Sequence, residues 1–202
     1  MKPDEPAVTE PVGDITPGPH VVTIGNFDGL HRGHQFLLNA LRARAADLGA
    51  RPLVVTFEPH PLSVLRPETA PLRVVSPDSK LQLLRRADVD VLVVEFTREF
   101  AGLEPEAFLD FLVLRTQPVA VLIGDGFRFG RARSGDSETL RAHGRLHGYQ
   151  VEDLELHADH GDPISSSRVR THLLAGNVRQ ASELLGRRFR LTGIVRGGLA
   201  RG

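Results

Sequence analysis

The chain has 202 residues, of which 41% are hydrophobic, and its 25 basic residues balance its 25 acidic residues to a formal net charge of zero. This length supports one main domain with a sizeable hydrophobic core, and the balanced charge excludes a global field that would recruit nucleic acid or an anionic membrane. The absence of cysteine excludes disulfides, thiolate metal sites and thiol nucleophiles.

The first 19 residues are rich in proline and acidic residues and contain no apolar core of signal-peptide length. This composition predicts a disordered leader over residues 1–19 and a cytoplasmic protein. No uninterrupted apolar stretch has the length needed to cross a bilayer. We therefore expect neither nucleic acid nor a membrane as a partner, and the sequence gives no indication of the oligomeric state.

After the leader, short apolar runs typical of strands alternate with helical patterns. The runs are rich in Val, Ile and Leu, as are strands that are buried on both faces. This alternation predicts an α/β domain over residues 20–187, with a Rossmann-like parallel sheet and helices on both faces. The predicted strands cover residues 21–26, 52–57, 91–96, 119–124 and, with a weaker pattern, 149–156.

Three helices are predicted between these strands. Apolar residues recur at helical spacing over 36–48, and Gly49 supplies the stop. Ser76 and Pro77 are typical of a helix cap and first turn, and Pro105 opens a third helix. Ligands of parallel sheets bind at the carboxyl ends of the strands, so we expect the motifs that follow the strands to lie close together.

The run His31-Arg32-Gly33-His34 lies where the first strand turns into the first helix. Backbone N–H groups and the positive end of a helix dipole attract anions at such a place. Two imidazoles add donors for the phosphates of a nucleoside triphosphate, and the glycine allows a close backbone approach. The plain alternative is a pair of surface histidines at a helix start. Asp28, just before the motif, either orients a histidine or a water molecule or is a turn residue.

A second motif, I-S-S-S-R-V-R, covers residues 164–170. A serine that caps a helix here leaves neighbouring hydroxyl and N–H groups to face phosphate. Arg170 follows Ser166 and Ser167 by one helical turn, near enough to share a ligand with them. The alternative is a capping serine cluster with a solvated arginine, and Arg168 either contacts ligand or faces water.

Two loops are rich in aromatic residues and proline: T-F-E-P-H-P at 56–61 and F-R-F-G at 127–130. Such side chains can pack against the flat ring system of a ligand. His60 either contacts phosphate or belongs to a rigid proline turn. The phenylalanines of the second loop either contact ligand or pack in the core from a short extended segment, in which case Arg128 points away from both of them.

These four segments, in this order, resemble the FAD synthetase family of nucleotidyltransferases with an H-x-G-H active site, and the resemblance covers residues 21–190. It implies that the phosphate of FMN attacks the α-phosphorus of ATP, which gives FAD and pyrophosphate, with Mg²⁺ held mainly by phosphates and water. The implied catalytic residues are His31, His34, Ser166 and Arg170. The implied ATP-binding residues are Gly25, Asn26, Phe27, Asp28, Gly33, Ser165, Ser167 and Arg168. The implied flavin-binding residues are Phe57, Pro59, His60, Asp125, Phe127, Arg128 and Phe129.

The chain departs from the family pattern at two positions. Ser167 replaces a threonine and keeps the hydroxyl, whereas Gly126 replaces the aspartate or asparagine that precedes the first phenylalanine of the F-R-F-G loop. Asp125 is displaced by one residue, which turns a side chain of an extended segment to the other face. Two alternatives therefore stay open: transfer of a nucleotide to another phosphorylated small molecule, and a paralogue that binds flavin nucleotide without turnover.

The last segment, 188–202, resembles the first strand of the riboflavin kinase barrel that follows in the bifunctional members of this family. A polar loop holds His157, Asp159, His160 and Asp162, which is a weak indication of a metal site. The histidines outside the H-x-G-H motif are otherwise expected at the surface.

Overall fold

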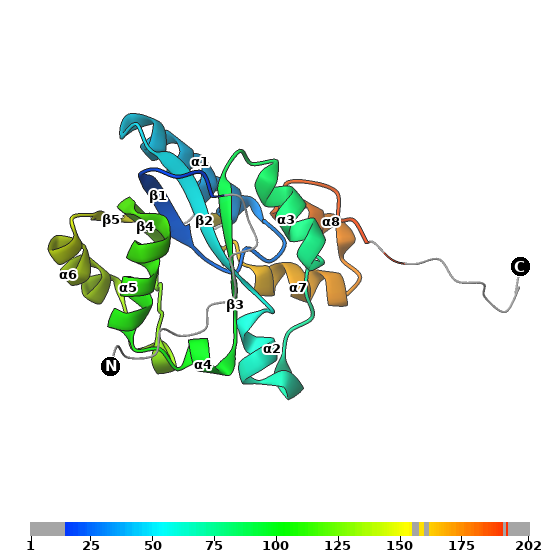
Figure 1. The fold of residues 1–202 in the computed structure, drawn as a ribbon. Helices are drawn as coiled ribbons and strands as arrows, with labels where there is room; N and C mark the ends of the chain where they lie inside the picture. The colour runs from blue at the N-terminus through cyan, green and yellow to red at the C-terminus, as the bar shows by residue number, and fades with distance from the viewer. Residues whose placement is uncertain (1–14, 155–157, 160–161, 192, 194–202) are drawn as a thin grey trace, which may run out of the picture.

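The computed structural model describes residues 15–154, 158–159, 162–191 and 193 (Figure 1). Its centre is a five-stranded sheet in the order β3-β2-β1-β4-β5, and all neighbouring strands are parallel. The strands are β1 His20–Ile24, β2 Arg51–Glu58, β3 Asp90–Glu95, β4 Pro118–Gly124 and β5 Gln150–Leu154. The predicted α/β fold with a parallel sheet is therefore confirmed.

Eight α-helices and two short 3₁₀ turns are described. The helices are α1 Arg32–Asp47, α2 Pro61–Leu65, α3 Pro77–Arg85, α4 Arg98–Ala101, α5 Pro105–Thr116, α6 Ser137–His147, α7 Ser166–Leu174 and α8 Val178–Leu185. The 3₁₀ turns are η1 Pro67–Thr69 and η2 Arg131–Arg133. Two short strands, β6 Ala158–Asp159 and β7 Asp162–Pro163, pair antiparallel.

Alternate residues of the central strands enter two separate cores because side chains of a strand point to opposite faces. Val22 of β1 packs in the core that α4, α5 and α6 cover, whereas its neighbour Val21 packs in the core that α1 and α3 cover. A third, smaller cluster joins α7 and α8 to Val74. Helices therefore cover both faces of the sheet, and α7 and α8 lie together beyond α3 (Figure 1).

The strand order creates a switch point at the centre of the sheet. The chain proceeds from β1 outward through β2 to β3 and then returns to add β4 on the other side of β1. Loops at the carboxyl ends of β1 and β4 diverge at such a point, which is where parallel sheets bind their ligands. The H-x-G-H motif follows β1 and the F-R-F-G loop follows β4, so both flank this switch point.

The expectation that the remaining histidines lie at the surface is wrong for His20 and His143, which are 2% and 8% exposed. The Nδ1 atom of His20 lies 2.7 Å from the carbonyl oxygen of Thr116, and both ring nitrogens of His143 have partners. An imidazole can be buried when its nitrogens find such partners, and neither partner was evident from local sequence.

Several predicted features lie outside the described part of the chain. These are most of the leader, His157 and His160 of the polar loop, and most of the segment 188–202. The structure therefore leaves these predictions as they stand. Among the helices that the structure does describe, none is long and apolar enough to cross a membrane.

Candidate active site

The first histidine of the motif caps helix α1. His31 has extended backbone angles, and its Nδ1 atom accepts the N–H of His34 at 3.3 Å. A neutral imidazole that accepts at Nδ1 carries its proton on Nε2. The cap therefore fixes the tautomer and leaves the Nε2–H of His31 as a donor beside the positive end of the helix.

The two imidazoles of the motif stack on each other. Their ring centroids are 3.7 Å apart with 16° between the planes, and His34 also contacts the ring of Phe27 at 4.9 Å. Burial, with a smaller effect of the Arg187 charge, lowers the pKa of His31 to about 4. Burial and then repulsion from His31 lower the pKa of His34 well below its usual value. Both rings are therefore neutral at pH 7 and can donate hydrogen bonds to an anion without repelling each other.

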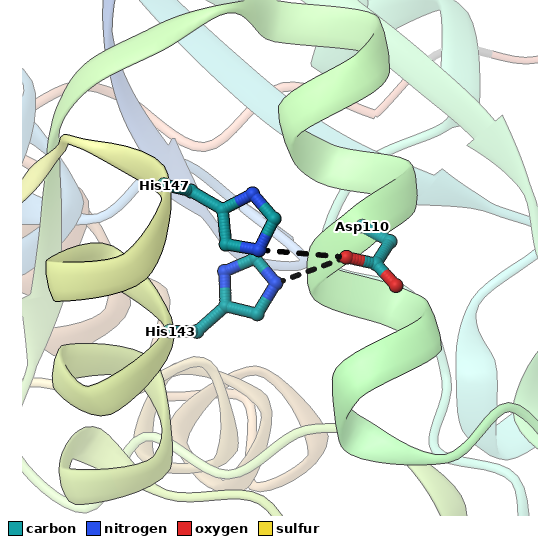
Figure 2. Close-up of side chains that lie close together, drawn as sticks. All are labelled: Asp110, His143 and His147. Atoms are coloured by element: carbon teal, nitrogen blue, oxygen red, sulfur yellow. Dashed lines mark hydrogen bonds and ion pairs between the residues drawn. The ribbon is translucent and has the colours of Figure 1, made fainter.

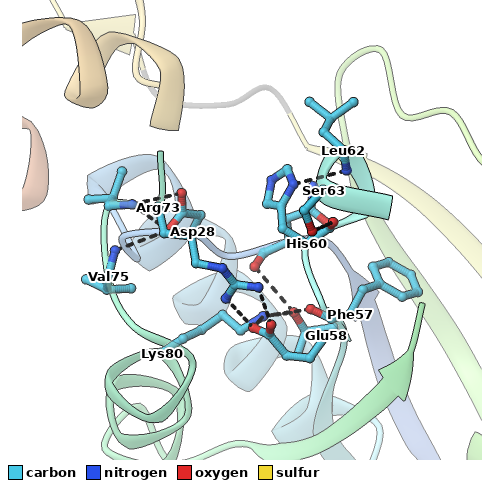
Figure 3. A network of polar contacts seen from close by, with 12 residues as sticks. Asp28, Phe57, Glu58, His60, Leu62, Ser63, Arg73, Val75 and Lys80 are labelled. Carbon is cyan, nitrogen blue, oxygen red and sulfur yellow. Dashed lines mark hydrogen bonds and ion pairs between the residues drawn. The ribbon is translucent and has the colours of Figure 1, made fainter. Parts of the chain in front are cut away.

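Asp28 has a role that neither sequence interpretation included. Its buried carboxylate accepts the N–H groups of Val74 at 3.0 and 3.1 Å and of Val75 at 3.3 Å (Figure 3). The same carboxylate forms an ion pair with Arg170 at 3.4 Å. The backbone oxygen of Asp28 accepts the hydroxyl of Ser166 at 2.8 Å. Asp28 thus ties the loop after β1 to the segment before α3 and to helix α7.

The second motif opens α7 as its sequence predicts. The Ser165 hydroxyl oxygen accepts the N–H of Arg168 at 3.3 Å and caps the helix. Arg170 reaches back to Ser167, whose hydroxyl accepts from Nη1 at 3.3 Å. The Nε atom of Arg170 is buried and has no hydrogen-bond partner within the described part of the chain. Arg170 is therefore not a solvated arginine, and it holds an unused donor beside Asp28.

Glycines allow the backbone segments of this site to approach closely. A Cβ on Gly33 would lie 3.2 Å from the carbonyl oxygen of Ile164, the residue before the second motif. Gly29 has φ +83°, and a Cβ there would lie 2.7 Å from Val74. Phe27 and Leu30 also have positive φ, which is rare for bulky residues. Such backbone strain is typical of functional loops.

Two residues that the sequence analysis did not select hold this loop in place. The Gln35 side chain donates to the carbonyl oxygens of Leu30 and Leu185, both at 2.8 Å. Arg187 donates to the carbonyl oxygens of Gly29 at 2.7 Å and of Leu30 at 3.2 Å. The loop carbonyls are therefore turned toward α8, and Arg187 brings a positive charge close to the histidine pair.

An ion-pair cluster around the buried Lys80 supports the E-P-H-P loop, and no local sequence pattern indicated it (Figure 3). The Glu58 carboxylate accepts from Arg73 at 3.0 and 2.5 Å and from Lys80 at 2.5 Å. Lys80 is 4% exposed and also donates to the carbonyl oxygen of Phe57 at 2.9 Å. Burial raises the pKa of Glu58, but the bonds to Arg73 and Lys80 outweigh this effect and leave the pKa below its usual value.

His60 caps helix α2 and keeps one nitrogen for other contacts. Its Nδ1 accepts the N–H of Leu62 at 3.2 Å, so Nε2 carries the proton of the neutral ring (Figure 3). Burial lowers the pKa of His60, and the charge of Asp28 opposes this effect. His60 therefore has the structural role in the turn, through Nδ1. Its Nε2–H remains a donor, close enough to Asp28 for that charge to affect the pKa of the ring.

The aromatic residues of the F-R-F-G loop share one face. The rings of Phe127 and Phe129 stack with centroids 5.5 Å apart, and both pack against the core that α5 covers. Phe129 is buried, whereas Phe127 and Phe57 are only partly buried. Arg128 is exposed and pairs with Asp136 at 3.2 Å. The loop therefore supplies core packing and also leaves aromatic surface at the carboxyl ends of β2 and β4.

The structure thus brings the two histidines, Asp28, Ser166, Arg170 and the E-P-H-P loop to one edge of the sheet. Asp125 and Gly126 are exposed in the turn after β4, and Asn26 is exposed after β1.

A hollow lies at the opposite edge of the sheet, near the amino ends of β2 and β3, and contains none of the motif residues. It is lined by Arg42, Ala45, Ala46, Ala50, Arg51, Pro52, Leu81, Arg85, Asp88, Val89, Asp90 and Val91.

Comparison with known proteins agrees with this geometry. The sequence model of the FAD synthetase family matches residues 15–168. The chain is 38% identical over 177 residues to the bifunctional riboflavin kinase/FMN adenylyltransferase of Escherichia coli K12, covering 87% of this chain and 56% of the relative. It is 41% identical over 183 residues to the bifunctional riboflavin kinase/FMN adenylyltransferase of Pseudomonas fluorescens, covering 87% of this chain and 57% of the relative. The chain thus spans a little over half the length of these relatives.

A solved structure extends the similarity to three dimensions. The crystal structure of a macrolide-efflux protein from Streptococcus pneumoniae superposes with a TM-score of 0.76 at 30% identity, covering 85% of this chain and 58% of that chain. The family match covers the strands, the histidine motif and the first residues of α7. The chain therefore belongs to the FAD synthetase family.

Proposed function

We propose that this chain transfers the adenylyl group of ATP to FMN, which gives FAD and pyrophosphate. A phosphate oxygen of FMN forms the new bond to the α-phosphorus, and the bond from that phosphorus to the oxygen bridging to the β-phosphate breaks. The observation that carries the proposal is the neutral, stacked histidine pair at the start of α1, at the switch point of the sheet, with Arg170 paired to Asp28 in the loop just before it. The names of the relatives agree with this reaction.

The histidine pair provides donors for the triphosphate. Nδ1 of His31 is occupied by the helix cap, so its Nε2–H is free to bind a phosphate oxygen. No protein nucleophile or proton transfer is needed, because the attacking phosphate is already anionic and pyrophosphate is a stable leaving group. Catalysis then consists of positioning and of stabilising charge in the transition state, as is general for phosphoryl transfer.

Arg170 and Ser166 have different tasks in this proposal. The Nε donor of Arg170 has no partner among the residues that the structure describes, and we assign this arginine to balancing charge on the departing pyrophosphate. The hydroxyl of Ser166 donates to the backbone oxygen of Asp28, so we assign Ser166 to positioning the loop that contains Asp28. We assign Gly25, Asn26, Phe27 and Gly33 before and at the start of α1, and Ser165, Ser167 and Arg168 at the start of α7, to the binding of ATP.

Magnesium fits this site as the counter-ion of the substrate. The Asp28 carboxylate is already engaged by two backbone N–H groups and Arg170, and imidazoles suit softer metals than Mg²⁺. Phosphate oxygens and water would therefore complete most of the octahedral shell. Bound in this way, Mg²⁺ would neutralise charge on the triphosphate.

The flavin nucleotide is proposed to bind on the aromatic side of the switch point. Phe57 and Phe127 offer partly exposed rings for the flavin, and buried Phe129 supports Phe127 from behind. Pro59 and His60 come from the E-P-H-P loop on the same edge, where the Nε2–H of His60 is a donor for the FMN phosphate. Asp125 and Arg128 are exposed on the β4 side and complete the proposed contacts.

The test is to incubate the purified chain with ATP, Mg²⁺ and FMN and to measure FAD and pyrophosphate by chromatography. Equimolar FAD and pyrophosphate are expected. Flavin binding without either product would support the non-catalytic paralogue, a hypothesis that Gly126 favours because it removes a polar side chain from the loop. Turnover with a different phosphorylated acceptor, and none with FMN, would support the other nucleotidyltransferase hypothesis.

A further inference from the structure

A second pair of histidines lies on the outer helices, outside every motif used above. His143 and His147 of α6 face Asp110 of α5 (Figure 2). Figure 1 shows these two helices on the other side of the sheet region from α7 and α8. The three side chains come from elements that hold none of the proposed ATP-binding or catalytic residues.

The geometry of these three residues matches a set of metal ligands. Residues four apart share one face of a helix, and the two rings stack at 3.9 Å with 6° between their planes. The Nε2 atoms of His143 and His147 lie 3.1 and 3.9 Å from the same Asp110 oxygen. One ligand atom from each residue lies within 4.8 Å of the others. Ligands around tetrahedral Zn²⁺ are about 3.3 Å apart, since each lies ~2.0–2.1 Å from the ion.

The surroundings of His143 also suit a ligand. Its Nδ1 lies 3.0 Å from the hydroxyl oxygen of Tyr149, and that hydroxyl is placed to donate to the carbonyl oxygen of Leu140 at 3.5 Å. Nε2–H of His143 donates to Asp110 at 3.1 Å in the absence of an ion. When a metal ion replaces that proton, the ring would take the tautomer whose Nδ1–H donates to Tyr149, and the lone pair of Nε2 would face the ion. Histidines that bind metals commonly donate their other N–H in this way, which fixes the ring.

The site is also accessible. The side chains of Asp110 and His147 are 65% and 38% exposed, whereas His143 is 8% exposed. An ion can therefore enter from solvent and meet a ligand that is already held rigidly. Two imidazoles and one carboxylate favour Zn²⁺ over Mg²⁺ or Ca²⁺, which prefer all-oxygen sites.

We propose that Asp110, His143 and His147 bind one divalent transition-metal ion, with Zn²⁺ as the preferred ion. A water molecule takes the fourth position of a tetrahedral shell. The ion links α5 to α6 and stabilises the outer layer of the domain, because it binds the folded chain and not the unfolded one.

The test uses the untagged full-length chain and needs no activity measurement. Titration with Zn²⁺ in a calorimeter is expected to give one ion per chain, and Co²⁺ is expected to give visible absorption typical of nitrogen and oxygen ligands. His147→Ala and Asp110→Asn change exposed positions, so the fold should persist by circular dichroism. Each is expected to weaken binding at least ~10-fold, since even indirect ligand partners contribute that much.

Three control variants make the result specific. His172→Ala on α7 and Glu138→Gln at the start of α6 change a histidine and an acidic residue outside the site, and both should bind Zn²⁺ as the wild type does. The double variant His157→Ala/His160→Ala should also retain binding. Zn²⁺ should raise the melting temperature of these controls and not that of His147→Ala. Equal affinity in His147→Ala, loss of binding in a control, or no binding at micromolar Zn²⁺ would overturn the proposal.

Discussion

Two pairs of histidines stack within the described part of the chain, and we propose that they bind ligands of opposite charge. His31 and His34 stack at 3.7 Å at the N-terminus of α1, and His143 and His147 stack at 3.9 Å in the last turns of α6. The dipole of a helix is positive at its N-terminus and negative at its C-terminus. The ring spacing is nearly the same in the two pairs, so the surroundings decide the chemistry.

The partners of each pair strengthen this difference. Nδ1 of His31 accepts a backbone N–H, and Arg187 adds positive charge nearby, so we propose that the Nε2–H of His31 donates to anions. In the second pair both Nε2 atoms face the carboxylate of Asp110, which attracts a cation. A histidine pair in a sequence therefore does not reveal its ligand until its cap, its charged neighbours and its helix end are known.

The largest expected effect is on the pair His31 and His34, which we propose binds the triphosphate. His31→Ala removes a donor that we propose stabilises charge in the transition state, so kcat should fall by ~10²–10³-fold. The measurement is the rate of FAD formation at saturating ATP and FMN. Leu146→Ala changes an 84% exposed residue on α6 and serves as the matched control with unchanged kcat. A His31→Ala enzyme with wild-type kcat would contradict the proposed role.

The edge that holds this pair is also expected to depend on the ion pair between Glu58 and the buried Lys80. Glu58→Ala leaves Lys80 buried without its carboxylate, which should lower the free energy of unfolding by about 3 kcal/mol. Urea unfolding measures this loss. The control is Arg51→Ala, which breaks an ion pair with Asp90 whose arginine is 50% exposed and should lower stability far less, because solvent screens an exposed pair. Equal losses in the two variants would show that the burial of Lys80 is unimportant.

The low pKa of His31 makes stability depend on pH. Its folded pKa is about 4 and its unfolded pKa about 6.5, so between these values the unfolded chain binds more protons than the folded chain. Stability from this group is therefore lost as the pH falls from 6.5 to 4, by about 2 kcal/mol at pH 5. Urea unfolding at pH 7 and pH 5 measures the change. The dependence should be weaker in His31→Asn, and an equal dependence would refute the assignment.

The smallest expected effect concerns the flavin side of the anion-binding edge. Gly126 has φ +69°, and a Cβ there would meet no atom of the described residues within 4 Å. Asparagine tolerates this backbone region better than most residues, so Gly126→Asn should fold normally. One restored hydrogen bond of ~1 kcal/mol would raise kcat/KM for FMN about fivefold. Gly126→Ala adds strain without a polar group and should give no gain; a rise in both variants would exclude a hydrogen bond as the cause.

Much of the fold and part of the site could be predicted from local sequence. The strands follow from apolar runs of Val, Ile and Leu, and the starts of α3 and α7 follow from serine caps. Helix α6 was not predicted, although Asp136 caps it and Gly148 ends it. The apolar positions of this short helix are few, and the signal for it lies mainly in its ends.

The class of fold, the family and the two motifs at the carboxyl edge could be predicted from the amino-acid sequence, because these signals lie in residues close together in the chain. The role of Asp28 became visible only in the folded chain, since its partners Val74 and Arg170 lie 46 and 142 positions away. The same holds for the contact of Arg187 with the loop after β1 and for the carboxylate that faces His143. Such contacts depend on how the helices pack on the sheet, and no local pattern records that geometry.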